Sequence, residues 1–421
     1  MRKVVVTGMG FVTSIGNSRA GVAKSLLELR HGISSWDPIP GADLPVNVAG
    51  IVKGFDVSSP NPNAWSWPTE YPLERRFVRG CPPHGVYAAC ALSQALAESG
   101  LSREDLSDGD TGLFCAGNGS PMLMRQQLNR MADTRWQRGN PLGIVSSVAG
   151  SLNFNLSAEF GIRGATCGFV SACASGSHAL GYAFDEITLG RQRRMLVVAG
   201  EDLNLESLLP FHAMNALALN PDPDTASRPF DSERSGFVAT GGAVALVLES
   251  EESALARGIR PQATMISWGQ ASDGYHIAHP HPEGRGLRDA MKRALAAAEI
   301  QPDSIDYINA HAPSTRAGDR AEALAVREVF TAHGANPAVS STKALTGHGL
   351  SLAGAMEAAF CVLALKEGFI PGQAHLRKVD PEFGFLNLPS KTRLNARPKV
   401  VLNNNSGFGG ANVCLIFSRY E

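Results

Sequence analysis

The sequence predicts an α/β protein in which helices pack on the faces of sheets. Short β-branched runs alternate with Ala- and Leu-rich stretches of helical composition, and this alternation is typical of helices layered on sheets. The chain also contains a repeat: the segment SGFVATGGAVALVLES, which starts at Ser235, resembles SGFGGANVCLIFSR, which starts at Ser406. Because each copy closes one half of the chain, we expect a duplicated α/β unit whose halves span residues 1–250 and 251–421.

The same patterns place the individual elements. The β-branched runs predict strands at Val4–Thr7, Leu196–Ala199, Ala243–Leu248, Ile305–Asn309, Val400–Asn403 and Val413–Phe417. The stretches between them predict helices at Gly85–Ser99, Gly286–Ala298, Arg320–Phe330 and Ala353–Leu365. In the second of these helices apolar residues recur every three or four positions, which is the spacing of an amphipathic face. They are Leu287, Ala290, Met291, Ala294 and Leu295.

Composition excludes several classes of protein. A formal net charge of -1 over 421 residues predicts no broad electrostatic attraction to nucleic acid or to an anionic membrane. The apolar start is interrupted by Gly8 and Gly10, so it predicts a first strand and not a secretory signal. No run approaches the roughly 18 apolar residues that a membrane span needs. The 7 cysteines are scattered without a CxxC pair, so we expect no metal site and a reduced, cytoplasmic enzyme.

The segment ATCGFVSACASGSHALG contains the candidate nucleophile. Thr166–Ala172 is strand-like and Ser177–Ile187 has helical composition, so Cys173 is expected where a strand turns into a helix, with Ser175 and Gly176 at the tight corner. The positive end of the helix dipole would favour the thiolate, which is the better nucleophile. The alternative is a buried structural cysteine, the role expected of Cys90, Cys361 and Cys414.

Two further constellations carry histidine. His311 follows the strand Ile305–Asn309, and Lys343 and His348 lie in a Gly-rich loop before a helix that carries Glu357. Strand-to-helix junctions are where α/β folds collect their chemistry. Two imidazoles can hydrogen-bond one thioester carbonyl as charge develops on it, which suits enolate formation by decarboxylation of a malonyl group. The remaining histidines considered are expected to be ordinary surface or core residues: His276, His279, His281 and His333.

These motifs carry a family resemblance. The sequence resembles the β-ketoacyl-[acyl-carrier-protein] synthases, among them the KAS II group of bacterial fatty acid synthesis. The matching segments keep the family's order from end to end: VVVTGMGFVTSIG, SACASGSHALG, TASRPFDSERSGFV, ASDGYH, STRAGDRAEA, SSTKALTGHGLSLAGAMEA and NNSGFGGAN. The resemblance implies a thiolase fold, a duplicated five-layer αβαβα architecture. It also implies a homodimer, with a heterodimer with a related subunit as the alternative.

The resemblance further implies an acyltransferase activity. The expected reaction is a decarboxylative Claisen condensation of malonyl-acyl carrier protein with an acyl chain bound to Cys173. The pathway is left open between fatty acid synthesis and specialised polyene or polyketide synthesis. No intrinsic cofactor is expected, because 4′-phosphopantetheine arrives on the acyl carrier protein. Arginines at positions 75, 76, 79, 135 and 138 are candidates for meeting the acidic face of that carrier, with solvated surface charge as the alternative.

Carried over residue by residue, the resemblance implies the following roles. His311 and His348 bind the malonyl carbonyl, and Lys343 supports them. Glu322 is the buried acid that partners the lysine, and Asp319 is a further supporting acid.

The resemblance also implies which residues form the oxyanion hole and which bind the phosphopantetheine arm. The backbone N–H groups of Cys173 and Phe408 form the oxyanion hole, and Phe408 also controls acyl access. Thr315 hydrogen-bonds the phosphopantetheine arm. The chain departs from the family at Pro313, which stands where a threonine is expected to bind the arm and cannot hydrogen-bond through its ring.

Three other departures concern the acyl pocket. Asn118 falls where a large aliphatic residue is common, and Gly143 and Ser406 fall where aromatic rings are common. They predict a roomier, partly polar pocket for a polyunsaturated, aryl-bearing or oxygenated chain. The alternative is that backbone groups at a dimer interface satisfy Asn118 and that the substrate is an ordinary fatty chain.

Three other functions are each compatible with only part of these motifs. A chain-length-factor-like partner that does not elongate would lack the nucleophile, which this chain keeps. A thiolase or another acyltransferase of the same fold is a second alternative. Thiolases use a second cysteine near the C-terminus, where this chain has Gly409-Gly410-Ala411-Asn412, and Cys414 on the next strand is expected to point into the structure. A nucleotide-binding role for VTGMGFVTSIG is weak, because its glycines do not spell GxGxxG.

Overall fold

The computed structural model describes residues 2–421, in which ten strands form one mixed sheet in the order β10-β9-β11-β12-β8-β1-β7-β6-β4-β5. The six predicted strands are confirmed, and most are longer than expected. The bounds are β1 Val4–Val12, β4 Thr111–Ala116, β5 Thr166–Phe169, β6 Arg194–Glu201, β7 Gly242–Ser250, β8 Ala263–Ser272, β9 Tyr307–Asn309, β10 Ala338–Ser340, β11 Val400–Gly407 and β12 Ala411–Arg419. A separate small sheet pairs β2, Ile33–Ser35, with β3, Val48–Gly50.

The strand order reads the same from both ends of the sheet. From the centre outward, one half runs β1-β7-β6-β4-β5 and the other runs β8-β12-β11-β9-β10. In each half, the strand that comes first in the chain is at the centre and the strand that comes last is next to it. Within the ten-stranded sheet, the two halves meet where β1 pairs antiparallel with β8, through Val4, Val5 and Val6. This is the arrangement that duplication of one α/β unit produces, and β7 and β12, the strands of the sequence repeat, occupy equivalent positions.

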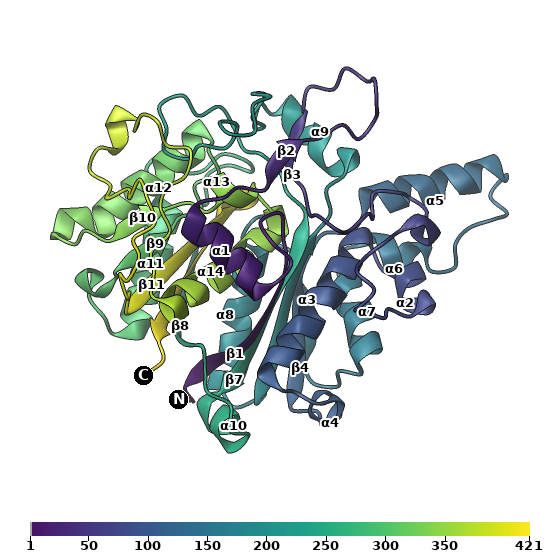
Figure 1. Cartoon of the computed structure of the whole chain (residues 1–421), viewed down its shortest axis with the longest axis horizontal. Helices are drawn as coiled ribbons and strands as arrows, with labels where there is room; N and C mark the ends of the chain where they lie inside the picture. The colour runs from purple at the N-terminus through teal and green to yellow at the C-terminus, as the bar shows by residue number, and fades with distance from the viewer. Residues whose placement is uncertain (1) are drawn as a thin grey trace.

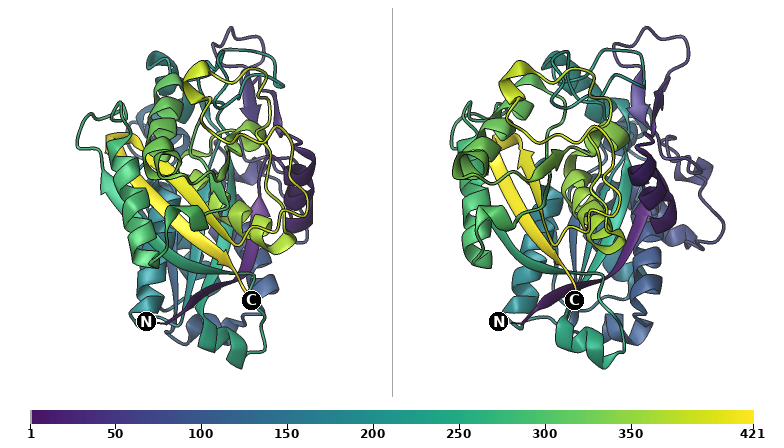
Figure 2. Two further views of the ribbon diagram at one scale, coloured as in Figure 1. Left: turned by 90° about the vertical axis from the view of Figure 1, so that its left-hand side faces the viewer. Right: turned by 60° about the vertical axis from the view of Figure 1, so that its left-hand side comes forward.

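Helices complete the layers. The main ones are α3 Pro83–Ser99, α7 Ser151–Phe160, α8 Ser175–Thr188, α11 Arg285–Ala298, α12 Arg316–Val329 and α14 Ala353–Glu367. Figure 1 shows α11 and α12 on one side, α3 and α7 on the other, and α8 and α14 between the two halves of the sheet. α8 and α14 each contact strands of both halves. In Figure 2 the yellow strands β11 and β12 lie between helices on either side. The expected five-layer architecture is confirmed.

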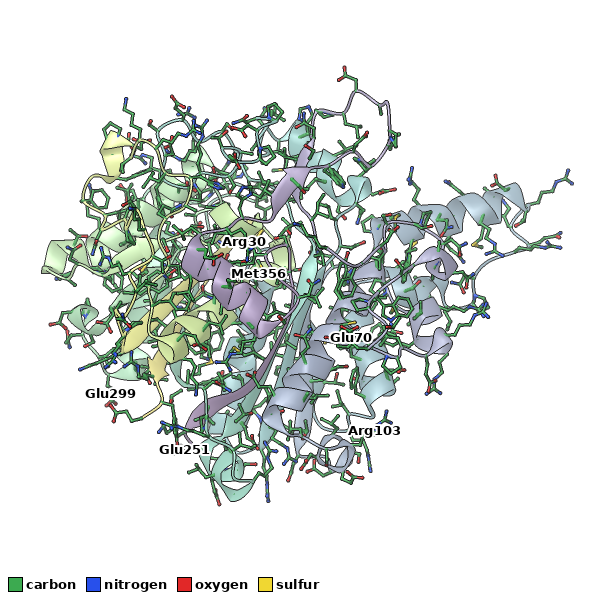
Figure 3. All side chains as sticks on the ribbon, in the orientation of Figure 1. Arg30, Glu70, Arg103, Glu251, Glu299 and Met356 are labelled. Carbon is green, nitrogen blue, oxygen red and sulfur yellow. The ribbon has the colours of Figure 1, made fainter. Side chains whose placement is uncertain are left out.

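The outer and the central helices differ in how they are buried. In α11 the five apolar residues of the predicted face are all buried. In α14 every residue from Ala353 to Leu365 is buried, as expected of a helix enclosed on all sides. Figure 3 places Met356 of α14 inside the molecule, whereas Glu251 and Glu299 lie at its edge. Within residues 2–421 no helix is both long and apolar enough to cross a membrane.

The two central helices cross at a pair of glycines. A methyl group placed on Gly176 of α8 would lie 2.7 Å from the Ala355 nitrogen, and one on Gly354 of α14 would lie 2.5 Å from the Ser177 nitrogen. Only glycine permits backbones to approach so closely. The crossing therefore holds the start of α8 against the loop that precedes α14.

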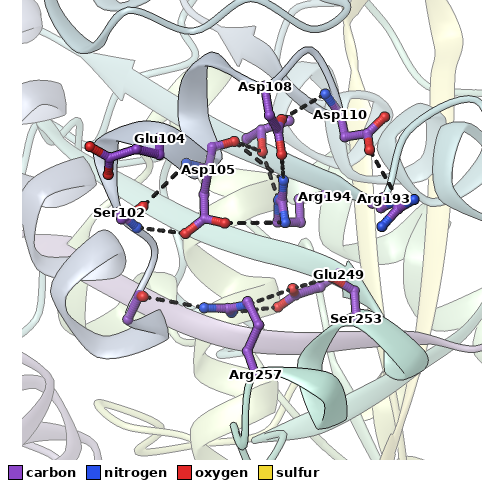
Figure 4. Close-up of polar contacts among 12 residues, drawn as sticks. Ser102, Glu104, Asp105, Asp108, Asp110, Arg193, Arg194, Glu249, Ser253 and Arg257 are labelled. Carbon is purple, nitrogen blue, oxygen red and sulfur yellow. Dashed lines mark hydrogen bonds and ion pairs between the residues drawn. The ribbon is translucent and has the colours of Figure 1, made fainter.

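Ion pairs secure the end of the sheet at which β6 begins (Figure 4). Arg194 is 5% exposed; it donates to Thr111 Oγ1 at 2.7 Å and pairs with Asp105 of α4, Arg103–Ser107. Glu249, 0% exposed, pairs with Arg257 at 2.9 Å. Loss of one partner would leave a buried charge uncompensated, so these contacts tie α4 and the segment after β7 to the sheet.

Candidate active site

Cys173 lies at the junction between β5 and α8, as predicted. The tight corner, however, is not at Ser175 and Gly176, which are the first residues of the helix. It is at Ala172, whose φ of 51° lies in the left-handed region and costs a non-glycine residue roughly 1–2 kcal/mol. The Ser175 hydroxyl accepts from the Ser171 N–H at 2.8 Å and donates to the Ala172 carbonyl at 2.6 Å. Ser175 thus holds the strained turn that presents the thiol.

Burial affects the protonation of Cys173. The pKa of the Cys173 thiol is raised to about 12, mainly by burial; the positive charge of Lys343 opposes this rise, and Glu201 adds to it. The side chain is 8% exposed and packs in an apolar cluster with Leu208, Phe237 and Leu350. Burial therefore favours the thiol and opposes the effect expected of the helix end.

His311 and His348 line one cavity of about 470 Å³ together with Cys173. Their ring centroids are 5.2 Å apart with the planes at 86°. Burial lowers the pKa of both imidazoles well below the ordinary value, and the charge of Lys343 lowers both further. Neither Nδ1 atom has a hydrogen-bond partner within residues 2–421. Both rings are therefore neutral and can donate a ring N–H to a substrate oxygen.

The backbone on either side of these rings is held in place. Glu322 accepts from the His311 N–H at 3.0 Å and from the Ala312 N–H at 2.6 Å. The His348 N–H donates to the Val238 carbonyl at 2.6 Å, and the His348 carbonyl accepts from Thr240 at 3.1 Å. A segment of the first half of the chain therefore positions a histidine of the second half.

Lys343 does not pair with Glu322, contrary to the expectation. Its ammonium group pairs with Glu357 of α14, and both side chains are 0% exposed. Asn405 of β11 donates to the other Glu357 oxygen at 2.7 Å. Burial raises the pKa of Glu357, and Lys343 opposes that rise. The sequence held a signal for this pair, because a single acid within the apolar segment AGAMEAAFCVLAL needs a cationic partner.

Asp319 is a structural acid. It is 0% exposed, and its two oxygens accept from the Ser314 and Phe230 N–H groups at 3.0 Å each. Both of those residues have left-handed φ values, 76° and 66°. Burial raises the pKa of Asp319 to about 7, while Arg234 lowers it. Asp319 therefore shapes the turn that carries Pro313 and Thr315 and does not face the cavity.

The end of β11 reaches the nucleophile. A methyl group on Gly407 would lie 2.4 Å from the Ser171 carbonyl oxygen and 3.2 Å from the Cys173 nitrogen, so no side chain fits there. Phe408 follows, lines the cavity and is 39% exposed. The Phe211 ring lies 5.8 Å from that of Phe408 and 5.3 Å from that of Phe237. The phenylalanines of the two sequence repeats thus flank the same site, which the repeat did not reveal.

This geometry agrees with what the chain matches. The β-ketoacyl synthase N-terminal domain matches residues 1–254 and the β-ketoacyl synthase C-terminal domain matches residues 262–377. The chain belongs to the β-ketoacyl synthase family.

Relatives of this family match along the whole chain. The protein is 35% identical to 3-oxoacyl-[acyl-carrier-protein] synthase 1 of Haemophilus influenzae and 34% identical to synthase 1 of Escherichia coli, over 100% of each chain. It is 34% identical to synthase 2 of Synechocystis, over 100% of this chain and 99% of the relative. A β-ketoacyl synthase from Burkholderia phymatum has a TM-score of 0.89 at 30% identity, and the ishigamide ketosynthase/chain length factor one of 0.87 at 28%, both over 100% of each chain.

Two of the hydroxyl groups expected at the synthase site line the cavity. Thr315 caps α12 by accepting from the Gly318 N–H at 3.2 Å, which leaves its O–H free to donate. Ser406 donates to Asn412 Oδ1 at 2.7 Å. The first hydroxyl is thus available to a ligand, whereas the second is already engaged.

Asn118 and Gly143 do not line this cavity, and their place in the acyl pocket stays a prediction. The Asn118 amide donates to Glu201 Oε2 at 3.1 Å, which turns it toward a buried acid. Gly143 begins the short helix α6, Gly143–Ser147, and packs against the Gln127 side chain. Within the described residues, Asn118 therefore contacts Glu201 and Gly143 contacts Gln127, and neither faces the cavity around Cys173.

Proposed function

We propose that this chain is a β-ketoacyl-[acyl-carrier-protein] synthase, an acyltransferase that joins an acyl chain carried on Cys173 to a malonyl group. The observation that carries the proposal is one cavity lined by a thiol and two neutral imidazoles. The full-length relatives named 3-oxoacyl-[acyl-carrier-protein] synthase support it. Cys414, the position that would concern a thiolase, is 0% exposed and lies outside the cavity.

The first step transfers the acyl chain. The Cys173 sulfur attacks the thioester carbonyl of the carrier arm, the bond to the arm sulfur breaks, and the Cys173 proton leaves with that sulfur as a thiol. The backbone N–H groups of Cys173 and Phe408 would hold the oxyanion, because donors fixed in a desolvated site stabilise developing charge strongly. The close approach of Gly407 to the Cys173 nitrogen supports this pairing.

The second step forms the new bond. His311 and His348 donate hydrogen bonds to the malonyl thioester carbonyl, the C–C bond to the carboxylate breaks, and carbon dioxide leaves. The resulting enolate attacks the acyl carbon on Cys173 and expels the thiolate, which takes a proton and returns to the thiol. Neutral imidazoles suit this task because they donate without carrying charge. Lys343 contributes by holding the histidine pKa values low.

We infer that the acyl and malonyl groups arrive on an acyl carrier protein, with 4′-phosphopantetheine as part of the substrate. The names of the relatives support this partner. We place the reaction in the cytoplasm, which agrees with seven cysteines that are all unpaired.

We also infer a dimer across the outer edge of β5. This strand ends the sheet, and its first three residues are exposed. Nearby on the same half, Val170 and Ile144 are each 60% exposed and Phe154 is 47% exposed. An unpaired strand edge beside exposed apolar side chains favours association. A second copy is the proposed occupant, and a related subunit is the alternative.

One experiment tests the function. Purified protein is incubated with malonyl-acyl carrier protein and a panel of saturated, polyunsaturated and aryl-bearing acyl carriers, and the products are identified by mass spectrometry. We expect β-ketoacyl products extended by the malonyl-derived unit and an acyl adduct on Cys173. The chain that reacts fastest separates a fatty acid from a specialised polyene or polyketide pathway. Turnover with acetyl-CoA and none with the malonyl donor would indicate a thiolase instead.

A further inference from the structure

The rim of the cavity includes a loop, residues 273–284, which we call the mouth loop. It connects β8 to α11. Ala278, His279 and Pro280 of this loop line the cavity. The tip points the other way, since Tyr275 is 57% exposed and Ile277 is 82% exposed. The mouth loop therefore contributes one wall of the passage that leads from Cys173 to solvent.

The mouth loop is anchored at its base. Asp273 is 3% exposed and accepts from the N–H groups of His281 and Gly286 and from the Asn412 amide, each at 3.0 Å. The Ile277 carbonyl of the loop also accepts a hydrogen bond from the Gly409 N–H at 2.8 Å. This last bond ties the mouth loop to the turn that follows Phe408. These hydrogen bonds thus fix the position of the mouth loop relative to the cavity that contains Cys173.

His276 holds the backbone that places His279 at the cavity. Nδ1 of His276 accepts from the N–H groups of Ala278 and His279 at 3.0 and 3.1 Å. The two imidazole centroids are 4.7 Å apart, with the planes at 37°. His276 folds the chain back at this point, His279 lines the cavity, and the tilted contact between the two rings restricts its orientation. Within residues 2–421 the His279 imidazole itself makes no hydrogen bond.

The start of α12, next to the mouth loop, has few side-chain hydrogen-bonding groups without a partner. The mouth loop packs on α12, where Arg320 donates to the Pro282 carbonyl at 3.1 Å. Of the residues at the start of α12, Pro313 has no polar side chain, Thr315 already accepts from Gly318, and Arg316 supplies donors only. The Thr315 hydroxyl remains free to donate, whereas His279 offers both a donor and an acceptor nitrogen without a hydrogen-bond partner among residues 2–421.

We propose that His279 positions the phosphopantetheine arm by hydrogen-bonding one of its amides. A neutral imidazole has one N–H and one acceptor nitrogen, which complement the C=O and N–H of a secondary amide. The arm must pass the mouth loop when its thioester lies at Cys173. This assignment rests on the proposed function. It places arm recognition beside the 313–315 turn, where the Pro313 side chain has no hydrogen-bonding group.

The test compares two donors in the full-length protein with Cys173 already acylated. One donor is malonyl-pantetheine, which has the amides, and the other is a malonyl S-ethyl thioester, which lacks them. His279→Ala should lower kcat/KM for malonyl-pantetheine roughly 3- to 10-fold, as expected for one neutral hydrogen bond. It should leave the S-ethyl donor unchanged, and His279→Gln should restore part of the loss.

The matched control is His281→Ala in the same loop, because His281 does not line the cavity and its Nδ1 accepts only from Glu283. It should behave as the wild type with both donors. An equal loss with both donors in His279→Ala, or no loss with either, would overturn the assignment while the wild type remains active. A wild type that makes no β-ketoacyl product would overturn the proposed function itself, and the assignment with it.

Discussion

The two halves of the molecule share a strand order but use their strand ends differently. Asn118 follows β4 and His311 follows β9, which occupy equivalent places in the sheet. In the same way Cys173 follows the edge strand β5, whereas His348 lies beyond the edge strand β10. The first half thus supplies the nucleophile and the second half supplies both imidazoles. A duplicated framework brings its strand ends together, and divergence of single residues then divides the chemistry between them.

The electrostatic surroundings of the two halves also differ. Behind Cys173 lies Glu201, which is 1% exposed and accepts from Asn118 at 3.1 Å and Ser351 at 2.5 Å. Its charge raises the pKa of Cys173. Behind the histidines lies Lys343, whose charge lowers their pKa. Each half thereby favours the uncharged form of its own reactive groups.

The largest effect should come from the nucleophile. Cys173→Ala should reduce condensation by roughly 10⁴-fold or more, because no other group can carry the acyl chain. Malonyl decarboxylation, which depends on the second half, should persist. Intact-mass measurement should show no acyl adduct, whereas Cys167→Ala, at an exposed cysteine of β5, should acylate normally. An adduct in Cys173→Ala would contradict this division.

Next in size is the pair behind the histidines. Glu357→Ala should lower the free energy of unfolding by about 3–5 kcal/mol, because it leaves the buried Lys343 charge without a partner. Urea unfolding measures this loss. Replacing both residues, as Lys343→Met with Glu357→Leu, should recover much of it. Equal losses in the single and double variants would show that the pair is not the cause.

The histidines can be separated from the nucleophile. His348→Ala should slow malonyl decarboxylation by about 10²–10³-fold, the usual effect of removing one oxyanion donor. Acylation of Cys173 should remain, since it uses the other half of the site. Carbon dioxide release and intact mass report the two steps, and His333→Ala, an exposed histidine, serves as the control. Carbon dioxide release at the wild-type rate would refute the assigned role.

A smaller effect concerns pH and stability. Burial raises the pKa of Glu201 from 4.5 to about 7, so the folded state keeps a proton that the unfolded chain releases. The stability that the Glu201 proton contributes is therefore fully present at pH values below the pKa of Glu201 in the unfolded chain. It is lost as the pH rises to about 7. Between about pH 4 and pH 8 the wild type should lose roughly 3 kcal/mol more than Glu201→Gln. Parallel pH profiles in denaturant titrations would contradict this.

The smallest expected effect is on the carrier. Arg135 and Arg138 are exposed beyond α5, Pro121–Asp133, which packs on α9, Leu205–Ala213, the helix of Phe211. Reversing both charges should raise KM for the carrier a few-fold and weaken its salt dependence, because rim charges act mainly on association. Arg103→Glu, on α4 and labelled in Figure 3, is the distant control. Identical kinetics at low and high salt would exclude this surface.

The sequence by itself determined the layered α/β class, the repeat and the candidate residues for the chemistry. Each of these is visible in neighbouring residues: β-branched runs predict strands, the spacing in Gly286–Ala298 predicts an amphipathic helix, and short motifs mark Cys173, His311 and His348. The structure confirms these elements and brings the three side chains to one cavity. Local pattern was sufficient because strand and helix formation depend on short segments.

Only the tertiary structure decided which groups meet and how deeply they are buried. Lys343 pairs with Glu357 and not with Glu322, because Glu322 is occupied by backbone N–H groups and α14 passes beside Lys343. The pKa of Cys173 is raised because apolar side chains from distant segments cover it. Asn118 turns to Glu201 because β4 and β6 are neighbours in the sheet. Pairing and desolvation arise from packing between segments far apart in the chain, and no local pattern contains that information.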